Sequence, residues 1–194
     1  MNKENNIRQN ATSTEKLVMY ALLTAIVVAL QLLGSFIHFG VFSINLALVP
    51  IIIGAAIGGS LAGAWLGLVC AIVILARDSA AFLAVNAAGT IITVIAKGIL
   101  SGLAAGCVYK LLESKNRLLA VISAGIVCPV VNTGVFLIGC RIFFLKQIQA
   151  WGFSSIWNYM VLGIGLNFVV ELLINLVLSS VIVRLIDIKL QKKY

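Results

Sequence analysis

Three polar side chains near the C-terminus have a spacing that could form a ligand-binding surface. Asn167, Glu171 and Asn175 recur every fourth residue in a long apolar segment, so on a helix they share one face. Ionisable and amide side chains in such segments are costly and typically face a cavity or a polar partner. A carboxylate flanked by two amides suits a polar small molecule. The alternative is a clamp between helices, or a pair formed by Glu171 and Lys97.

Other apolar segments contribute further candidates. Lys97 could meet a ligand carboxylate, or it could extend its ammonium toward the membrane surface. Asn132 follows Pro129, a residue that bends a helix and frees backbone groups to join a site. Asn45 and Asn86 are weaker candidates, because amides at helix ends often only cap the helix.

The composition shows which elements must position these side chains. The chain has 194 residues, of which 62% are hydrophobic and 10% charged, whereas globular proteins are roughly 45–50% apolar and about 25% charged. This composition excludes a soluble enzyme and a nucleic-acid-binding domain, and the 14 Lys and Arg residues are scattered rather than clustered. The sequence holds one His and no GxSxG, HExxH or GxxxxGK[ST] motif, so we expect no enzymatic activity, no cofactor and no metal.

The fold class that we predict is all-α, a polytopic membrane protein with six transmembrane helices. A helix that crosses a membrane needs about 20 mainly apolar residues. Residues 17–187 would form the membrane domain, between a polar cytosolic tail (1–16) and a basic cytosolic tail (188–194). We expect helices at 17–37, 89–112, 118–144 and 155–186, two more within 44–76 divided at Gly58-Gly59-Ser60, and a loop at 77–86.

The basic residues predict the orientation of these helices. All but four of the 14 Lys and Arg residues lie on the side of the two termini, which places both termini in the cytosol. The other four are Arg77, Lys97, Arg141 and Lys146, and Asp78 is the acid among them. Such cations would concentrate anions at the outer face, so we include Arg141 among the candidate ligand contacts. Basic residues in outer loops also contact lipid head groups, which is the alternative.

Small residues recur every fourth position in several predicted helices, a spacing that lets another backbone approach one helix face. Glycines follow this spacing in the second, third and fourth predicted helices, where we favour packing within the bundle. Ala21, Ala25 and Ala29 follow it in the first helix. That alanine face could instead contact a partner subunit.

Three stretches together resemble the substrate-binding S component of an energy-coupling factor (ECF) transporter. They are ALLTA at residues 21–25, SINLALVPIIIGAAIGGSLAGAWLG at 43–67 and NFVVELLIN at 167–175. The resemblance implies a multi-pass protein of the bacterial plasma membrane that binds a vitamin under the loops joining helices one to two and three to four. It also implies association with a transmembrane coupling subunit (the T component) and two cytosolic ATPases, followed by toppling in the membrane. In that family an AxxxA motif in helix one contacts the coupling subunit, and Ala21 and Ala25 match it.

Among vitamins the resemblance is greatest to the pantothenate and riboflavin branches. The outer cations favour pantothenate, a monocarboxylate, ahead of neutral riboflavin and dianionic folate. The leading hypothesis is therefore a non-catalytic binding subunit with Lys97, Asn132, Asn167 and Glu171 lining its pocket. The alternative is a stand-alone ion-coupled transporter of a small anion in which Glu171 and Lys97 relay ions. A scaffold without a ligand is a third possibility, and the polar stripe on the last helix argues against it.

Overall fold

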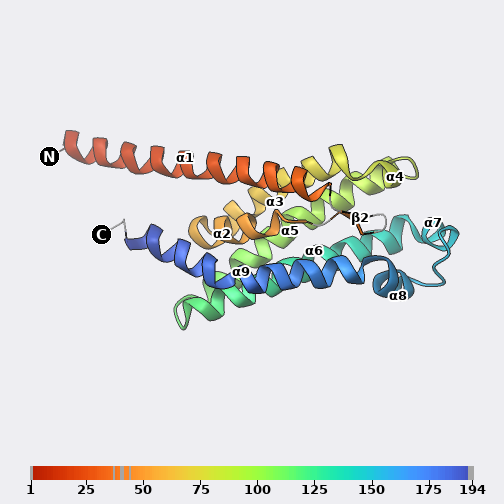
Figure 1. The fold of residues 1–194 in the computed structure, drawn as a ribbon. Coiled ribbons are helices and arrows are strands. Elements are labelled where there is room, and N and C mark those ends of the chain that lie inside the picture. Colours follow the sequence, from red (N-terminus) through yellow and green to blue (C-terminus); the bar gives the residue numbers. More distant parts are fainter. Residues whose placement is uncertain (1, 37, 40–41, 44, 192–194) are drawn as a thin grey trace.

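The computed structural model describes the backbone of residues 2–36, 38–39, 42–43 and 45–191, and the side chains of 14–36, 45–178 and 184. Of the predicted tails (1–16 and 188–194), the side chains of residues 1–13 and 188–194 are therefore outside the described part. In order, the elements are α1 (Asn2–Gly34), β1 (His38–Phe39), β2 (Phe42–Ser43), α2 (Leu48–Gly58), α3 (Ser60–Arg77), α4 (Ala80–Leu83), α5 (Ala87–Leu112), α6 (Arg117–Phe143), α7 (Leu145–Ala150), α8 (Ile156–Asn158), the π-helix η1 (Tyr159–Ile164) and α9 (Gly165–Gln191). Figure 1 shows these elements as an elongated helical bundle.

Five helical segments within the described residues are long and apolar enough to cross a membrane. They are Thr14–Gly34, Ser60–Arg77, Ala87–Leu112, Arg117–Phe143 and Ile156–Leu178. The expected second helix corresponds to α2, which has 11 residues. At 1.5 Å per residue this helix covers only about half of a 30 Å hydrocarbon core. The predicted all-helical membrane fold is thus confirmed in its five long helices, and six spans remain a prediction.

Local departures from the predicted helices have clear causes. The expected division of residues 44–76 lies at Gly59, whose φ of 83° ends α2 and allows the chain to turn into α3. The spacing of Gly59, Gly63 and Gly67 also predicts that Gly59 belongs to the glycine face of the third helix. This prediction is wrong, because Gly59 precedes α3. The expected loop at 77–86 contains the short helix α4. Near the start of the last long segment, η1 interrupts the α-helical pattern.

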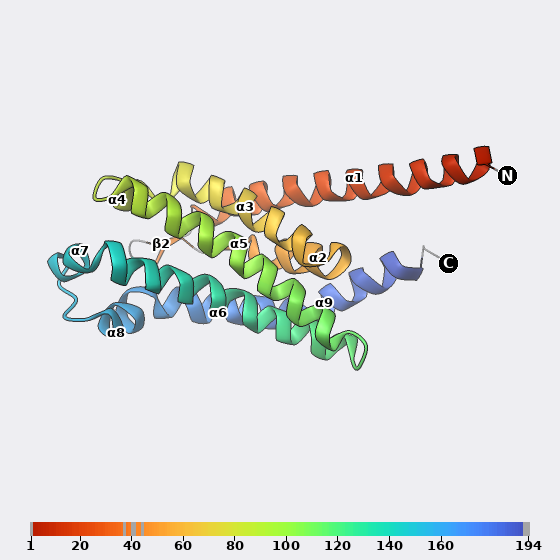
Figure 2. The ribbon, with the colours of Figure 1, turned by 180° about the vertical axis from the view of Figure 1, so that it is seen from behind.

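The ends of the bundle differ in what they carry. Helix α1 begins and α9 ends at one end, whereas α4, α7 and α8 gather at the opposite end in both views (Figures 1 and 2). β1 and β2 pair antiparallel, with His38 opposite Ser43. Residues 45–47, just before α2, are not helical, yet Asn45 and Ala47 are buried. The segment directly before α2 therefore lies in the interior of the bundle.

Helices α3 and α5 pack with their backbones in direct contact. A Cβ atom at Gly67 would overlap the carbonyl oxygen of Gly98, and one at Gly98 would overlap the carbonyl oxygen of Gly67. Gly63 and Gly102 have the same reciprocal relation one turn away. These glycines thus bring two backbones together inside the bundle, as their spacing predicted.

This contact predicts that two Gly→Ala variants differ strongly in stability. Gly98→Ala should destabilise the protein by about 1–3 kcal/mol, because the added methyl group meets backbone that cannot move independently of its helix. Gly134→Ala is the matched control, since a Cβ at Gly134 meets no atom within 4 Å. Thermal unfolding in detergent should show a lower Tm for Gly98→Ala alone. Equal Tm values for the two variants would contradict the close contact.

Candidate functional site

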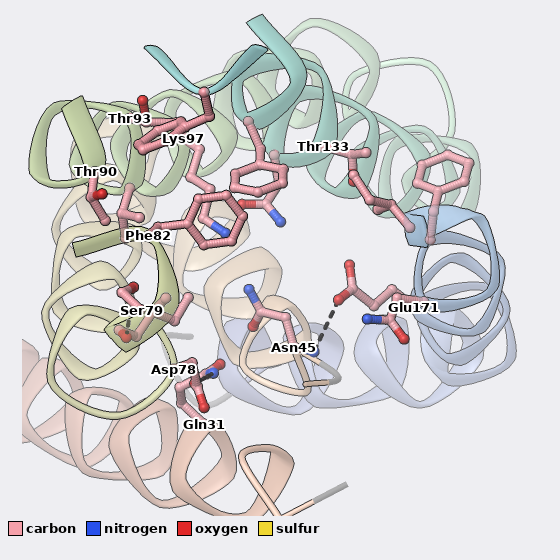
Figure 3. A pocket seen from close by; sticks show the side chains of 18 residues that line it. Gln31, Asn45, Asp78, Ser79, Phe82, Thr90, Thr93, Lys97, Thr133 and Glu171 are labelled. Atoms are coloured by element: carbon pink, nitrogen blue, oxygen red, sulfur yellow. Dashed lines mark hydrogen bonds between the residues drawn. The ribbon is translucent and has the colours of Figure 1, made fainter. Parts of the chain in front are cut away.

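A cavity lies among the helices, lined by residues from α1, α3, α4, α5, α6 and α9 (Figure 3). Its polar lining residues are Gln31, Asn45, Asp78, Ser79, Thr90, Thr93, Lys97, Asn132, Thr133, Asn167 and Glu171. Four phenylalanines, Phe82, Phe136, Phe144 and Phe168, also line it. A concave pocket in which polar groups converge among aromatic side chains is typical of a small-molecule site.

Glu171 connects α9 to the connection before α2. Its Oε1 accepts a hydrogen bond of 2.9 Å from the backbone N–H of Asn45, and the two residues are only 7% and 8% exposed. Because Asn45 is not helical, its N–H has no helix carbonyl as a partner, and a buried unpaired N–H is costly. The carboxylate of Glu171 thus fixes an irregular segment beside the cavity (Figure 3). One turn earlier on α9, Asn167 lines the same cavity.

A second set of contacts reaches the same segment from α3. The Cys70 thiol lies 3.6 Å from both Gln31 Oε1 and Asn45 Oδ1. A thiol carries one hydrogen, so these oxygens share a single weak donor. Cys70 is buried, as expected for a small hydrophobic residue. It joins α1 and the Asn45 segment through their amide oxygens.

Lys97 presents the cavity with its positive charge. It is half-buried on α5, and its Nζ lies 5.0 Å from the centroid of the Phe136 ring, a cation–π distance. Among the described residues, no carboxylate lies within 4 Å of this ammonium. The expected alternative of a direct Lys97–Glu171 ion pair is therefore absent from this part of the chain.

Among the described residues, two buried oxygens in the cavity wall have no hydrogen-bond partner. They are Asn167 Oδ1 and Thr93 Oγ1, and both residues are about 4% exposed. Since buried polar atoms are nearly always paired, such atoms call for an explanation. Asn175, one turn beyond Glu171, is 1% exposed but does not line the cavity, and it packs near Gly125. The expected three-residue stripe thus contributes its first two members to the site.

Several residues that line the cavity were not predicted from the sequence, although their types and spacing resemble those of the predicted ones. Thr90 and Thr93 precede Lys97 at helical spacing and share its face of α5. Gln31 is an amide within the apolar part of α1 and is 1% exposed. Asp78 had been assigned to a loop, but it lines the cavity at the end of α3.

Five predicted ligand contacts come together in this cavity, and two do not. Lys97, Asn132, Asn167, Glu171 and Asn45 line it. Asn86 instead caps α5, accepting a 2.9 Å hydrogen bond from the Gly89 N–H. Arg141 is exposed at the end of α6, outside the cavity wall. Arg77 and Lys146 are also exposed and lie outside the cavity wall. Of the four outer cations that favoured an anionic substrate, only Lys97 therefore lines the cavity.

Three phenylalanines of the cavity wall belong to an aromatic cluster near the short helices. Phe82 of α4 packs edge-to-face on Phe136, Phe144 and Trp151, with ring centroids 5.7, 5.1 and 5.4 Å apart. Such arrangements add about 0.5–1.5 kcal/mol per pair beyond area burial. Phe82 thereby ties the short segment between α3 and α5 to α6 and to the segment after α7.

The alanine face of α1 is directed away from the bundle. Ala21, Ala25 and Ala29 are exposed, whereas Leu23 and Val27 on the other side of the helix are buried. The small residues therefore do not pack α1 against its neighbours in this chain. This leaves a smooth exposed surface on the helix that also contributes Gln31 to the cavity.

Comparison with known proteins identifies the family. A family model described as ECF transporter, substrate-specific component, matches residues 15–186. No curated protein and no solved structure matched. Apart from Thr14, the match covers all five long apolar segments. It also covers every residue that lines the cavity. The chain belongs to the family of substrate-specific components of ECF transporters.

Proposed function

We propose that this chain captures a water-soluble vitamin in the cavity and delivers it as part of an ATP-driven importer. Pantothenate is the favoured substrate, ahead of riboflavin and folate. The observation that carries the proposal is the Lys97 ammonium, which faces the cavity with no carboxylate within 4 Å among the described residues. The family assignment does not favour the alternative of a stand-alone ion-coupled transporter.

The chemistry of the wall supports a ligand with one negative charge and several hydrogen-bonding groups. Lys97 can hold a carboxylate through a charged hydrogen bond. The unpaired oxygens of Asn167 and Thr93 and the carboxylate of Glu171 accept hydrogen bonds. Pantothenate offers a carboxylate, an amide N–H and two hydroxyls. Folate brings two carboxylates to a wall that already contains Asp78 and Glu171, which weighs against it.

The arrangement in the membrane follows from the same elements. We infer that α2 and the non-helical residues 45–47 before it belong to a sixth crossing, because non-helical backbone is tolerated at membrane depth where it lines a cavity. Six crossings agree with the placement of both chain ends at one end of the bundle (Figure 1). The basic residues assign that end to the cytosol, in the plasma membrane of a bacterium. The opposite end, with α4, α7 and α8, then faces the substrate.

Purified chain should bind pantothenate tightly, with a dissociation constant at or below the micromolar range. Isothermal titration calorimetry and a ligand-induced increase in Tm would measure this, and riboflavin and folate serve as comparisons. The absence of binding for all three vitamins would contradict a high-affinity vitamin subunit. Transport by this chain alone in proton-gradient vesicles would favour the stand-alone transporter instead.

Lys97→Ala should weaken pantothenate binding by about 1–3 kcal/mol, the range for a hydrogen bond to a charged group. That range corresponds to roughly 5- to 150-fold in Kd. Lys146→Ala is the matched control, because Lys146 is an exposed lysine outside the cavity wall. An unchanged Kd in Lys97→Ala would return this lysine to a structural role, and an equal loss in both variants would indicate long-range attraction rather than contact.

The exposed alanine face of α1 should contact the transmembrane coupling subunit, which in turn associates with two ATPases. Ala21→Trp and Ala25→Trp should abolish copurification with that subunit and leave vitamin affinity unchanged. Ala88→Trp, at an exposed alanine near the start of α5, is the control. Retained copurification in the α1 variants would contradict this contact, and loss of vitamin affinity as well would indicate misfolding.

A further inference from the structure

Asp78 lies at a position where its carboxylate does not stabilise the helix to which it belongs. It is the C-cap residue of α3, where its N–H bonds to the Ile74 carbonyl. The C-terminal end of a helix carries a partial negative charge, so a carboxylate there is electrostatically unfavourable. Among the described residues, no cation lies within 4 Å of it, and the neighbouring Arg77 is exposed. The side chain nevertheless lines the cavity (Figure 3).

Gln31 of α1 and Ser35, which directly follows α1, hold this carboxylate through one of its oxygens. Gln31 Nε2 donates to Asp78 Oδ2 at 3.1 Å, and Ser35 Oγ donates to the same oxygen at 2.7 Å. Gln31 and Ser35 are buried, 1% and 8% exposed. Both donors are neutral, so they orient the carboxylate without cancelling its charge. The other oxygen, Oδ1, receives no hydrogen bond from the described residues.

None of the charged groups that the structure describes around the cavity donates a hydrogen bond to Asp78 Oδ1. Lys97 is the cation of the wall, and its ammonium contacts the Phe136 ring. Glu171 already accepts the Asn45 N–H. Two carboxylates therefore face one ammonium, and Asp78 Oδ1 accepts no hydrogen bond from the described residues. A ligand that brought only an anionic group would increase this excess of negative charge.

We propose that Asp78 is a substrate-binding residue whose Oδ1 accepts a hydrogen bond from a hydroxyl or amine group of the substrate. The substrate then carries an anionic group for Lys97 and a donor group for Asp78. Gln31 and Ser35 are positioning residues, because they fix the carboxylate through Oδ2. This proposal rests on the proposed function and adds a requirement that an anionic group alone does not meet.

Asp78→Asn separates contact with the ligand from support of the fold. The amide oxygen of Asn can accept from Gln31 and Ser35 as Oδ2 does, so the connection between α1 and α3 is retained. The position of Oδ1 is then taken by an NH₂ group, which donates hydrogen bonds and cannot accept one from a ligand hydroxyl. Titration calorimetry with pantothenate, riboflavin and folate should show a loss of at least 10-fold in the affinity of whichever vitamin the wild type binds, with an unchanged Tm of the ligand-free protein.

Two further variants act as controls. Glu113→Gln removes an exposed carboxylate outside the cavity and should leave the affinity unchanged. Ser35→Ala removes one of the two donors to Oδ2 and should lower the affinity less than Asp78→Asn does. Affinity in Asp78→Asn within twofold of the wild type would overturn the proposal, and so would a loss accompanied by an equal destabilisation in the absence of ligand. If the wild type itself binds none of the three vitamins, the proposed function fails first.

Discussion

The hydrogen bond from the Asn45 N–H to Glu171 is the interaction on which the cavity depends. An irregular segment enters the interior between α1 and α2, and inside a membrane protein its backbone groups have no bulk water to bond. Glu171 supplies the acceptor from α9, at the far end of the sequence. The hydrogen bond from the buried Asn45 N–H thereby offsets part of the desolvation cost of the Glu171 carboxylate. The bond holds the connection before α2 against α9, so that residues from both ends of the chain line one pocket.

The contact of α3 with α5 provides the complementary constraint. Because Gly67 and Gly98 bring the two backbones together, the register between these helices is fixed. Lys97 lies next to Gly98 on α5, and Asp78 lies at the end of α3. The same packing therefore determines where the cavity places a cation and a carboxylate relative to each other. Phe82, on the short helix between α3 and α5, packs against the Phe136 and Phe144 rings in α6 and at its C-terminal end.

The sequence predicted those features that depend on local composition and periodicity. Long apolar runs identified the five long helices, Gly59 identified the division between α2 and α3, and the spacing of Asn167 and Glu171 identified one wall of the cavity. The position of Asp78 and the exposure of Arg141 depend on how helix ends are arranged in space, and their neighbours in sequence hold no information about that. Thr90, Thr93 and Gln31 could have been found, because the reasoning that selected Lys97 and Glu171 applies to them equally.

The most direct test of the account is hydrogen exchange at the Asn45 amide, followed by mass spectrometry of peptides that report it. Glu171→Gln keeps an acceptor oxygen on α9, and Glu171→Leu removes it. Asn175→Leu, one turn away and outside the cavity wall, controls for a general loosening of α9. We predict that the Asn45 amide stays protected in wild type, Glu171→Gln and Asn175→Leu and exchanges much faster in Glu171→Leu alone. Unchanged protection in Glu171→Leu would contradict the central role of this hydrogen bond.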